Sequence, residues 1–266
     1  MDQSQKLTFV LAENEDGKFF VLPNDVLGQH LLRGQRWEPY YTRVLPFVLP
    51  QGSTAIDVGA SIGYTSVVMA KTVGPSGNVF AFEPLQIVFE QLRNNINLNG
   101  LTNIYPSNLA IGHADEVTVS MVAVDYNEKD INTMNTCIGI GGDFVKMKTL
   151  DSFNFTDVSL LKIDVQGCEP YVLRGAASTI ERNRPVLFLE IEEPQLVTQN
   201  SSSVELIMQV LALDYILVKI VEGFVCDHIC VPREKRQMLP SIVQSVGLPT
   251  EIYVVKDGSL QQISAV

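Results

Sequence analysis

The sequence predicts an α/β fold in which a mostly parallel central sheet is covered by helices on both faces. From residue 53 onward, short apolar runs alternate with helical patterns, which is the order that builds a parallel sheet. The run TAIDV, residues 54–58, ends at a glycine-containing turn followed by a helical pattern, as at the entry of nucleotide-binding folds. The 266 residues, 46% of them hydrophobic, can bury one large core, so a single domain is expected.

Residues 1–50 are predicted to form an N-terminal extension or lid in front of a domain that spans 51–266. Two short β-like runs, 6–12 and 18–23, precede a segment at 31–50 whose pattern predicts a helix over the mouth of the fold. This segment carries an aromatic cluster of Trp37, Tyr40 and Tyr41. Two roles remain open for these three side chains: packing in the core, and forming a lid over the substrate.

The clearest helix of the domain is expected at 84–99, because it starts with proline, is followed by glycine and has one apolar face. The alternating run at 116–124 predicts an antiparallel strand, and the polar, glycine-rich stretch at 125–142 predicts a long loop. The other expected helices are 63–73, 167–183 and 204–214, and the other expected strands are 79–84, 103–112, 158–165, 184–194, 215–221, 224–231 and 251–257.

Charge and composition exclude several classes of partner. The formal net charge is −11, and no basic block that could neutralise phosphates is present, so we expect no nucleic-acid partner. We expect no membrane association, because no apolar stretch reaches the ~18 residues that cross a bilayer and the N-terminus lacks the order of a signal peptide. The four cysteines form no disulfide framework for a chain of this length. These features predict a cytoplasmic protein.

Four predicted strands each end in a carboxylate, and parallel strands present their carboxyl ends at one edge of the sheet. These residues are Asp57, Glu83, Asp164 and Glu190. The resulting anionic rim disfavours a dinucleotide pyrophosphate, and the turn from Gly59 to Gly63 lacks the Gly-x-Gly-x-x-Gly spacing. S-adenosylmethionine carries a sulfonium and an ammonium group, so it suits this rim, and Glu83 lies where a carboxylate can accept both ribose hydroxyls.

Several motifs occur in the order and spacing of one known family. They are AIDVGASIGYTS, VFAFEP, LRNNINLNG, NLAIG, KTLDSF, LLKIDVQGCEPYVLRGA and PVLFLEIE. Over about residues 34–192 the chain thus resembles the FkbM-type methyltransferases, a class I, S-adenosylmethionine-dependent family. The resemblance implies a Rossmann-like class I methyltransferase fold. It also implies methyl transfer to a hydroxyl of a sugar or other small molecule, so the expected partner is a small-molecule or glycan acceptor with a free hydroxyl.

The resemblance also assigns roles to individual residues. Asp57, Gly59 and Gly63 would hold the methionine part of the cofactor, Glu83 the ribose, and Asn108 with Leu109 the adenine edge. Ala60, Ser61 and Pro84 complete the expected cofactor-binding set. Trp37 and Glu38 resemble the family's pre-core helix that helps close the site. Gln166 and Cys168 depart from residues common in the family. Gln166 cannot titrate, so any acid or base role that the family assigns to this position moves to Asp164 or Glu169, or is not needed.

The catalytic candidates are Asp164, Lys162 and Glu190. Asp164 is the preferred proton acceptor, although Lys162 points to the same side of the strand and can pair with Asp164 or Glu190, which would make either a poorer base. A positioning role for Asp164 therefore remains open, and a structural role is favoured for Glu190. No metal site is expected, neither magnesium at Asp164, Glu169 and Glu190 nor zinc at Cys226, His228 and Cys230.

Two other functions compete with methyl transfer. One is a methyltransferase-like module that binds the cofactor or a protein without catalysis, against which the intact Asp57, Glu83 and Asp164 argue. The other is a nicotinamide oxidoreductase, which the loop spacing and the charge disfavour.

Overall fold

A central sheet organises the computed structural model, which describes residues 7–125, 128, 131–133, 136–256 and 259–264. Among these residues the sheet has nine strands in the order β14-β13-β11-β12-β10-β9-β3-β4-β5. The parallel half comprises β3 (Thr54–Val58), β4 (Asn78–Phe82), β5 (Ile104–Ser107), β9 (Val158–Ile163) and β10 (Val186–Glu190). The antiparallel half comprises β11 (Tyr215–Ile220), β12 (Asp227–Pro232), β13 (Thr250–Lys256) and β14 (Ser259–Ser264).

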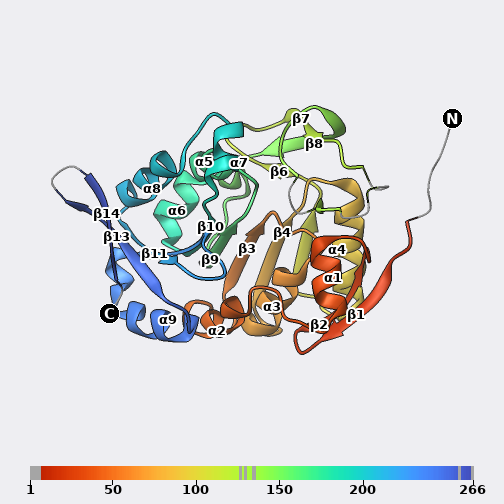
Figure 1. The fold of residues 1–266 in the computed structure, drawn as a ribbon, viewed down its shortest axis with the longest axis horizontal. Helices are drawn as coiled ribbons and strands as arrows, with labels where there is room; N and C mark the ends of the chain where they lie inside the picture. Colours follow the sequence, from red (N-terminus) through yellow and green to blue (C-terminus); the bar gives the residue numbers. More distant parts are fainter. Residues whose placement is uncertain (1–6, 126–127, 129–130, 134–135, 257–258, 265–266) are drawn as a thin grey trace.

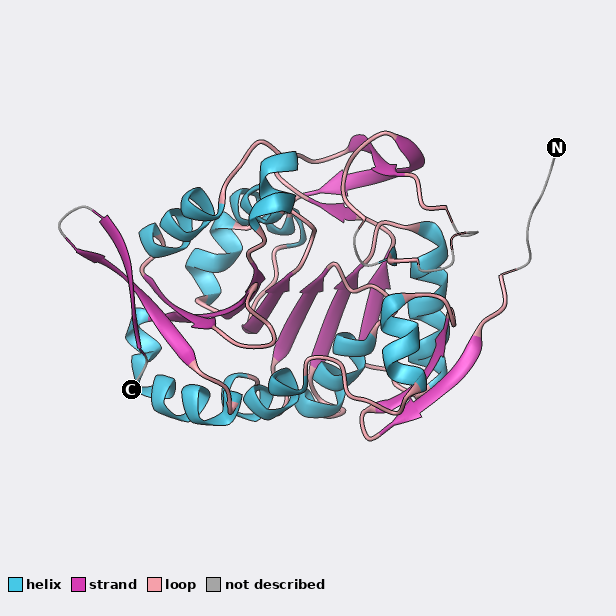
Figure 2. Cartoon of the chain, viewed as in Figure 1, coloured by secondary structure: helices cyan, strands magenta, loops and turns pink. Residues whose placement is uncertain are grey.

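Helices cover both faces of this sheet, as Figures 1 and 2 show. Alternate residues of β3 enter different hydrophobic clusters, Ala55 one and Ile56 the other, because successive side chains of a strand point to opposite faces. The first cluster includes side chains from α2 (Pro39–Val48), α3 (Tyr64–Val73), α4 (Gln86–Leu98) and α9 (Leu239–Val246). The second includes side chains from α5 (Glu169–Gly175), α6 (Ala177–Asn183), α7 (Glu193–Thr198) and α8 (Ser203–Ala212). The predicted α/β class is confirmed.

The N-terminal segment packs into the first cluster. It contains the hairpin β1 (Val10–Asn14) and β2 (Gly17–Val21), followed by α1 (Val26–Leu32). The side-chain oxygens of Asn95 and Asn99 on α4 accept hydrogen bonds from the backbone N–H groups of Phe20 and Lys18. Figure 1 shows β2 lying beside α4. The division into an extension at 1–50 and a domain at 51–266 stays a prediction, and Lys6 of the first β-like run lies outside the described residues.

The chain between β5 and β9 departs from the prediction. The run at 103–112 divides, so that β5 joins the central sheet while β6 (Ala110–Ile111) joins β7 (Val117–Val122) and β8 (Gly141–Lys148). The antiparallel direction expected for 116–124 is confirmed by the pairing of β7 with β8. Residues 126–127, 129–130 and 134–135 of the predicted loop lie outside the described residues, and so does Asp257 of the expected final strand.

The helix expected at 167–183 is interrupted at Ala176, between α5 and α6. A Cβ atom on Gly175 would lie 1.8 Å from the carbonyl oxygen of Gly112, so the chain needs glycine at this contact. Two 3-10 helices, η2 (Leu150–Phe153) and η3 (Arg233–Met238), and the strands β8 and β14 were not predicted. No helix in the described part of the chain is both long enough and apolar enough to cross a membrane.

Candidate functional site

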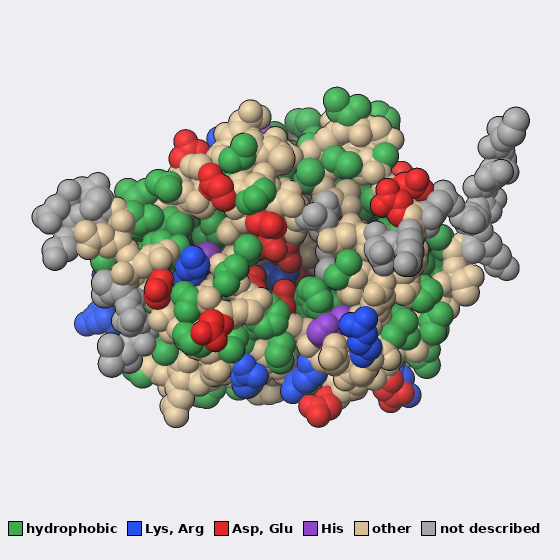
Figure 3. Space-filling view, in the orientation of Figure 1, with side chains coloured by type: hydrophobic (Ala, Val, Ile, Leu, Met, Phe, Trp, Pro, Cys, Tyr) green, Lys and Arg blue, Asp and Glu red, His purple; other side chains and the backbone are tan. Residues whose placement is uncertain are grey.

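A cavity opens at the carboxyl ends of β3, β4 and β9. Figure 3 shows the hollow near the centre of the molecule, with acidic and basic side chains inside it. Among the described residues, its charged and amide-bearing side chains are those of Glu38, Glu83, Lys162, Asp164 and Gln166. Ligands of open α/β sheets bind at this edge, so the cavity is the candidate site.

The turn after β3 forms one wall of the cavity. Gly59 has φ +82°, and a Cβ atom there would lie 1.8 Å from the carbonyl oxygen of Asp164. The N–H groups of Gly59 and Ala60 both donate to the carbonyl oxygen of Phe82, which joins the turn to the end of β4. The turn therefore needs glycine at position 59, both for its backbone conformation and because Asp164, at the end of the neighbouring strand β9, approaches closely.

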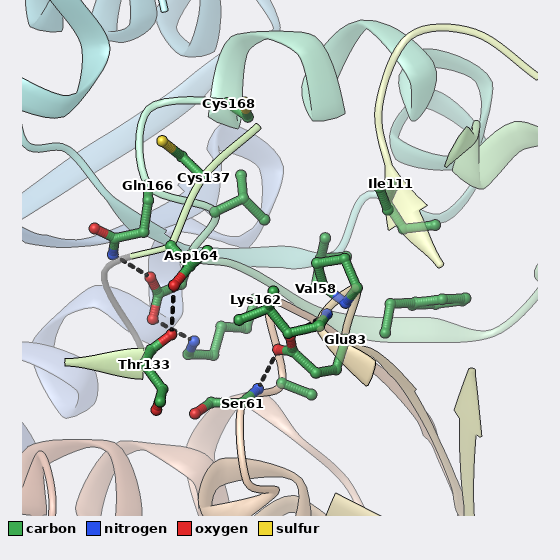
Figure 4. A pocket seen from close by; sticks show the side chains of 18 of the residues that line it. Val58, Ser61, Glu83, Ile111, Thr133, Cys137, Lys162, Asp164, Gln166 and Cys168 are labelled. Atoms are coloured by element: carbon green, nitrogen blue, oxygen red, sulfur yellow. Dashed lines mark hydrogen bonds and ion pairs between the residues drawn. The ribbon is translucent and has the colours of Figure 1, made fainter. Parts of the chain in front are cut away.

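Glu83 links the end of β4 to this turn. Its Oε2 accepts a hydrogen bond of 2.9 Å from the N–H of Ser61, and its Oε1 accepts one of 2.9 Å from the N–H of Leu85 (Figure 4). Burial raises the pKa of Glu83 to about 7, against these hydrogen bonds, which lower it. Each carboxylate oxygen retains a second lone pair, so Glu83 can accept two further hydrogen bonds from hydroxyl groups in the cavity.

The remaining expected cofactor residues divide into two groups. Gly59, Ala60, Ser61, Glu83, Pro84 and Leu109 line the cavity, whereas Asp57, Gly63 and Asn108 lie behind its surface. The Asn108 side chain donates to the carbonyl oxygens of Glu83 and Pro84, so it supports the backbone after β4. Gly63 precedes α3 with φ +89° and faces Leu92, which leaves no room for a Cβ atom.

Asp57 is fully buried beneath the turn. Its Oδ2 accepts a hydrogen bond of 2.6 Å from the hydroxyl of Ser66 on α3. Its Oδ1 is 3.9 Å from the Nζ atom of Lys162 and has no hydrogen-bond partner in the described structure. Burial raises the pKa of Asp57, although the charge of Lys162 opposes the shift. Asp57 therefore fixes the end of β3 against α3 and Lys162.

The buried Lys162 and the partly buried Asp164 form an ion pair at the end of β9, with Nζ 2.8 Å from Oδ2. Burial alone would raise the pKa of Asp164, but the charge and hydrogen bond of Lys162, aided by Glu190 and Gln166, hold it below its usual range. Burial opposes the charge on Lys162, yet Asp164, Asp57 and Glu38 raise its pKa. Asp164 is thus an ionised carboxylate with little basicity.

Gln166 joins Asp164 to Glu190. Its Nε2 donates to Asp164 Oδ1 at 3.2 Å and to Glu190 Oε2 at 2.7 Å. Figure 4 marks the contacts that join Gln166 to Asp164 and Asp164 to Lys162. Burial and the charge of Asp164 raise the pKa of Glu190 to about 11, so Glu190 is protonated at neutral pH. Glu190 does not line the cavity. Of the four carboxyls expected at the rim, only Glu83 and Asp164 line the cavity, and Lys162 offsets part of their charge.

Glu169 stabilises the loop that carries Gln166, because its Oε1 accepts hydrogen bonds from the N–H groups of Val165 and Gly167. At the zinc candidates, a ring nitrogen of His228 contacts the carbonyl oxygen of Cys226, and Cys230 packs in the second hydrophobic cluster. Within the described residues no group of three or more His, Cys, Asp or Glu side chains is arranged to hold a metal ion.

The aromatic cluster divides between core and cavity. Tyr40 and Tyr41 are buried, and the Tyr41 ring lies 4.5 Å from that of Phe188 between centroids. Trp37 lines the cavity. The Tyr40 hydroxyl donates a hydrogen bond of 2.6 Å to Asp227, a residue that the sequence analysis did not single out as a site candidate. Burial raises the pKa of Asp227 to about 7.

The cavity also contains side chains from the long loop, which the sequence did not assign individually. Thr133, Thr136, Cys137 and Ile138 line it. Asp25, at the start of α1, accepts hydrogen bonds from the N–H and hydroxyl of Thr133 at 2.9 and 2.7 Å. The only sequence signal for these residues is the length and composition of the loop, which marks it as functional or mobile.

Comparison with known proteins identifies relatives among methyltransferases. Methyltransferase 1 of Beauveria bassiana is 27% identical over 157 residues, or 50% of this chain and 61% of the relative. A protein-L-isoaspartate O-methyltransferase of Methanothrix thermoacetophila is 28% identical over 85 residues, or 31% of this chain and 40% of the relative. The matched regions thus span less than two thirds of either relative.

Solved structures with a similar fold include an FkbM methyltransferase from Methylobacillus flagellatus. It has a TM-score of 0.49 and 17% identity, with 77% of this chain and 52% of that chain covered. Fibrillarin of Aeropyrum pernix, solved with S-adenosyl-L-methionine, has a TM-score of 0.43 and 16% identity, with 86% of this chain and 84% of that chain covered. The model of the methyltransferase FkbM domain matches residues 57–217, more than half of the chain, which therefore belongs to the FkbM methyltransferase family.

Proposed function

We propose that this protein transfers the methyl group of S-adenosylmethionine to a hydroxyl oxygen of a sugar or other small molecule. The observation that carries the proposal is Glu83, a desolvated carboxylate fixed by two backbone N–H groups at the wall of the cavity. Membership of the FkbM methyltransferase family supports methyl transfer as the reaction. Transfer to a hydroxyl oxygen is the more specific part of the proposal.

The residues at the glycine turn fit the methyl donor. Glu83 would accept the two ribose hydroxyls, and the buried hydroxyl oxygen of Ser61, which has no partner in the described structure, would bond the cofactor. The ionised Asp164 lies across the cavity floor and would favour a positively charged group near it. When bound, S-adenosylmethionine supplies a methyl group activated by a sulfonium.

Methyl transfer is an in-line displacement, so the main task of the protein is to align the acceptor oxygen with the methyl carbon. The loop residues Thr133, Thr136 and Cys137 provide further polar groups that line the cavity. They would orient an acceptor of small or sugar-like size. Lys162 and Asp164 would fix the electrostatic field at the reacting centre, because the buried lysine and the partly exposed carboxylate are paired before any ligand enters.

Calorimetric titration with S-adenosylmethionine, S-adenosylhomocysteine and NADH tests the cofactor. We expect the first two to bind and NADH not to bind. Glu83→Gln removes the charge and places an NH₂ group against a backbone N–H, so it should weaken cofactor binding by about 10- to 100-fold. Glu90→Gln on the exposed side of α4 is the matched control and should leave affinity within about twofold.

Formation of S-adenosylhomocysteine against a panel of glycosides and hydroxylated metabolites tests the acceptor. Turnover with at least one hydroxyl compound, and methyl ether in the product, supports the proposal. A protein that binds the cofactor but methylates no compound in the panel would instead be a non-catalytic cofactor-binding module. Absence of cofactor binding would refute the proposed function altogether.

A further inference from the structure

Among the described residues, three carboxyl side chains line the cavity, and two of them are engaged by the protein. Glu83 accepts two backbone hydrogen bonds, and both oxygens of Asp164 are occupied by Lys162 and Gln166. In the described part of the chain the Glu38 side chain forms no ion pair and accepts no backbone hydrogen bond; the side chain of Trp37, acting as a donor, lowers its pKa. Glu38 is therefore the cavity carboxyl with the most free acceptor capacity.

The backbone at Glu38 is unusual. With φ 41° and ψ 60° it is in the left-handed region, at the start of α2, where its side chain makes no capping hydrogen bond. This conformation costs a residue with a side chain about 1–2 kcal/mol, and such strain tends to occur at functional sites. A glutamate that leaves the helix end uncapped and instead lines the cavity has a role there.

Neighbouring contacts hold the strained segment in place. Arg36 forms two hydrogen bonds to the buried Asp16, at 2.9 and 2.6 Å. The N–H of Trp37 donates to the Tyr64 hydroxyl at 3.2 Å, and Tyr64 itself lines the cavity at the start of α3. The position of Glu38 is thus coupled to the glycine turn that ends β3.

The charged groups around Glu38 come from three elements. Asp227 faces it from β12, Lys162 and Asp164 face it from the end of β9, and Tyr40 and Tyr41 lie beside it on α2. Burial and Asp227 raise the pKa of Glu38 well above its usual range, and Lys162 opposes them. A positive charge that enters the cavity will lower this pKa and favour loss of the proton from Glu38.

We propose that Glu38 is the catalytic residue that accepts the proton of the acceptor hydroxyl. This inference rests on the proposed function. The acceptor oxygen forms a bond to the methyl carbon while the carbon–sulfur bond breaks, and the electron pair of that bond stays on sulfur. The hydroxyl proton passes to a Glu38 carboxylate oxygen, which later returns it to solvent. Asp164 acts as a fixed negative charge and takes no proton.

The first test needs no acceptor. Calorimetry in phosphate and in Tris at pH 7.5 measures the protons released when S-adenosylmethionine or S-adenosylhomocysteine binds. Only the first carries a sulfonium, so the wild type should release more protons with it than with S-adenosylhomocysteine. Glu38→Gln should abolish this difference, and the control Glu222→Gln, at an exposed position, should retain it. An undiminished difference in Glu38→Gln would overturn the inference.

The second test uses the best hydroxyl compound from the acceptor panel and its thiol analogue. Glu38→Gln should lower kcat for the hydroxyl compound by about 10²- to 10⁴-fold while the cofactor Kd changes less than about threefold. A thiol ionises without help near pH 8.5, so its methylation should fall less than about tenfold. Equal losses with both compounds, or no loss with the hydroxyl compound, would refute a proton-accepting role.

The outcomes separate the inference from the proposed function. Failure of the wild type to bind S-adenosylmethionine would refute both. Normal turnover by Glu38→Gln would refute only the role of Glu38. Where cofactor binds but no panel compound is methylated, the proton-release measurement decides: a sulfonium-dependent release that disappears in Glu38→Gln supports the inference, and its persistence overturns it.

Discussion

The Nζ atom of Lys162 lies 2.8 Å from Oδ2 of Asp164, and the lysine is almost entirely removed from solvent. Residues at i and i+2 of a strand project to the same side, so the sequence KID brings these two charges together at the strand end. Asp57 from the neighbouring strand lies 3.9 Å from the same nitrogen. One buried ammonium group thus compensates two carboxyls, which gives it a structural as well as an electrostatic role.

Replacement of Lys162 by methionine should strongly destabilise the protein. The change leaves the buried Asp57 and the partly buried Asp164 without a cation. Removal of one partner from a buried ion pair costs about 3–5 kcal/mol. Urea denaturation at pH 7 measures the loss. Lys146→Met removes an exposed lysine that pairs with Glu116 and should cost less than about 1 kcal/mol. Equal losses in the two variants would contradict the role assigned to Lys162.

Stability should decrease as pH rises from 5.5 to 8. Burial raises the pKa of Glu83, Glu169 and Asp227 to about 7 in the folded protein. Their ordinary values are about 4, so between these limits the folded state binds more protons than the unfolded state. Stabilisation from these groups is present below the unfolded pKa and is lost as pH rises toward 7. The lowered pKa of Asp164 affects stability only at lower pH, where its stabilisation is lost as the carboxylate takes up a proton.

We expect the free energy of unfolding to fall by at least about 2 kcal/mol across this range, measured by urea denaturation in 0.3 M salt to screen surface repulsion. Glu169→Gln should make the dependence shallower, because it removes one of the carboxyls whose pKa is raised in the folded protein. A constant or rising stability over the same range would show that these carboxyls are ionised in the folded protein.

The parallel half of the sheet could be predicted because its strands are buried on both faces. All five residues of β3 are buried, and such strands appear in the sequence as continuous apolar runs. The strand β8 gives no such signal, since only Val145 and Met147 of its eight residues are buried. The break after Gly175 depends on a close contact with Gly112, which is distant in the sequence. Local patterns do not report contacts of this kind.

The same distinction applies to the site. Gly59, Glu83 and Asp164 could be predicted because each follows directly from a strand end. Thr133 could not be identified, because its place at the cavity depends on Asp25, 108 residues earlier. The sequence also gave no indication that Asn108 would turn its amide to the backbone carbonyls of Glu83 and Pro84. Hydrogen-bond partners of this type are decided by the folded geometry.

Gly59→Ala should prevent folding or reduce stability by more than about 3 kcal/mol, because the new Cβ would lie 1.8 Å from a backbone oxygen that cannot move independently. Gly52→Ala is a matched control. Gly52 has φ +81°, almost equal to the +82° of Gly59, but its nearest contact is a serine side chain at 3.4 Å. The control should lose only the backbone cost of about 1–2 kcal/mol. Thermal and urea denaturation of both variants measure the difference, and similar losses would show that the close contact is unimportant.

Thr133→Val should impair acceptor use without affecting the cofactor. Asp25 caps α1 with Oδ1, which accepts from Leu27 N–H, and holds Thr133 with Oδ2. The valine retains the shape and the N–H of threonine but loses one hydrogen bond, and it leaves the helix cap intact. We expect the acceptor KM to rise about 3- to 10-fold, which corresponds to a loss of about 1 kcal/mol of acceptor binding free energy, while the cofactor Kd stays within twofold. Asp25→Ala removes both connections, so it should raise KM further and also reduce stability by about 1 kcal/mol. A change in cofactor affinity equal to the change in acceptor KM would show that this loop segment supports the whole cavity and does not act on the acceptor alone.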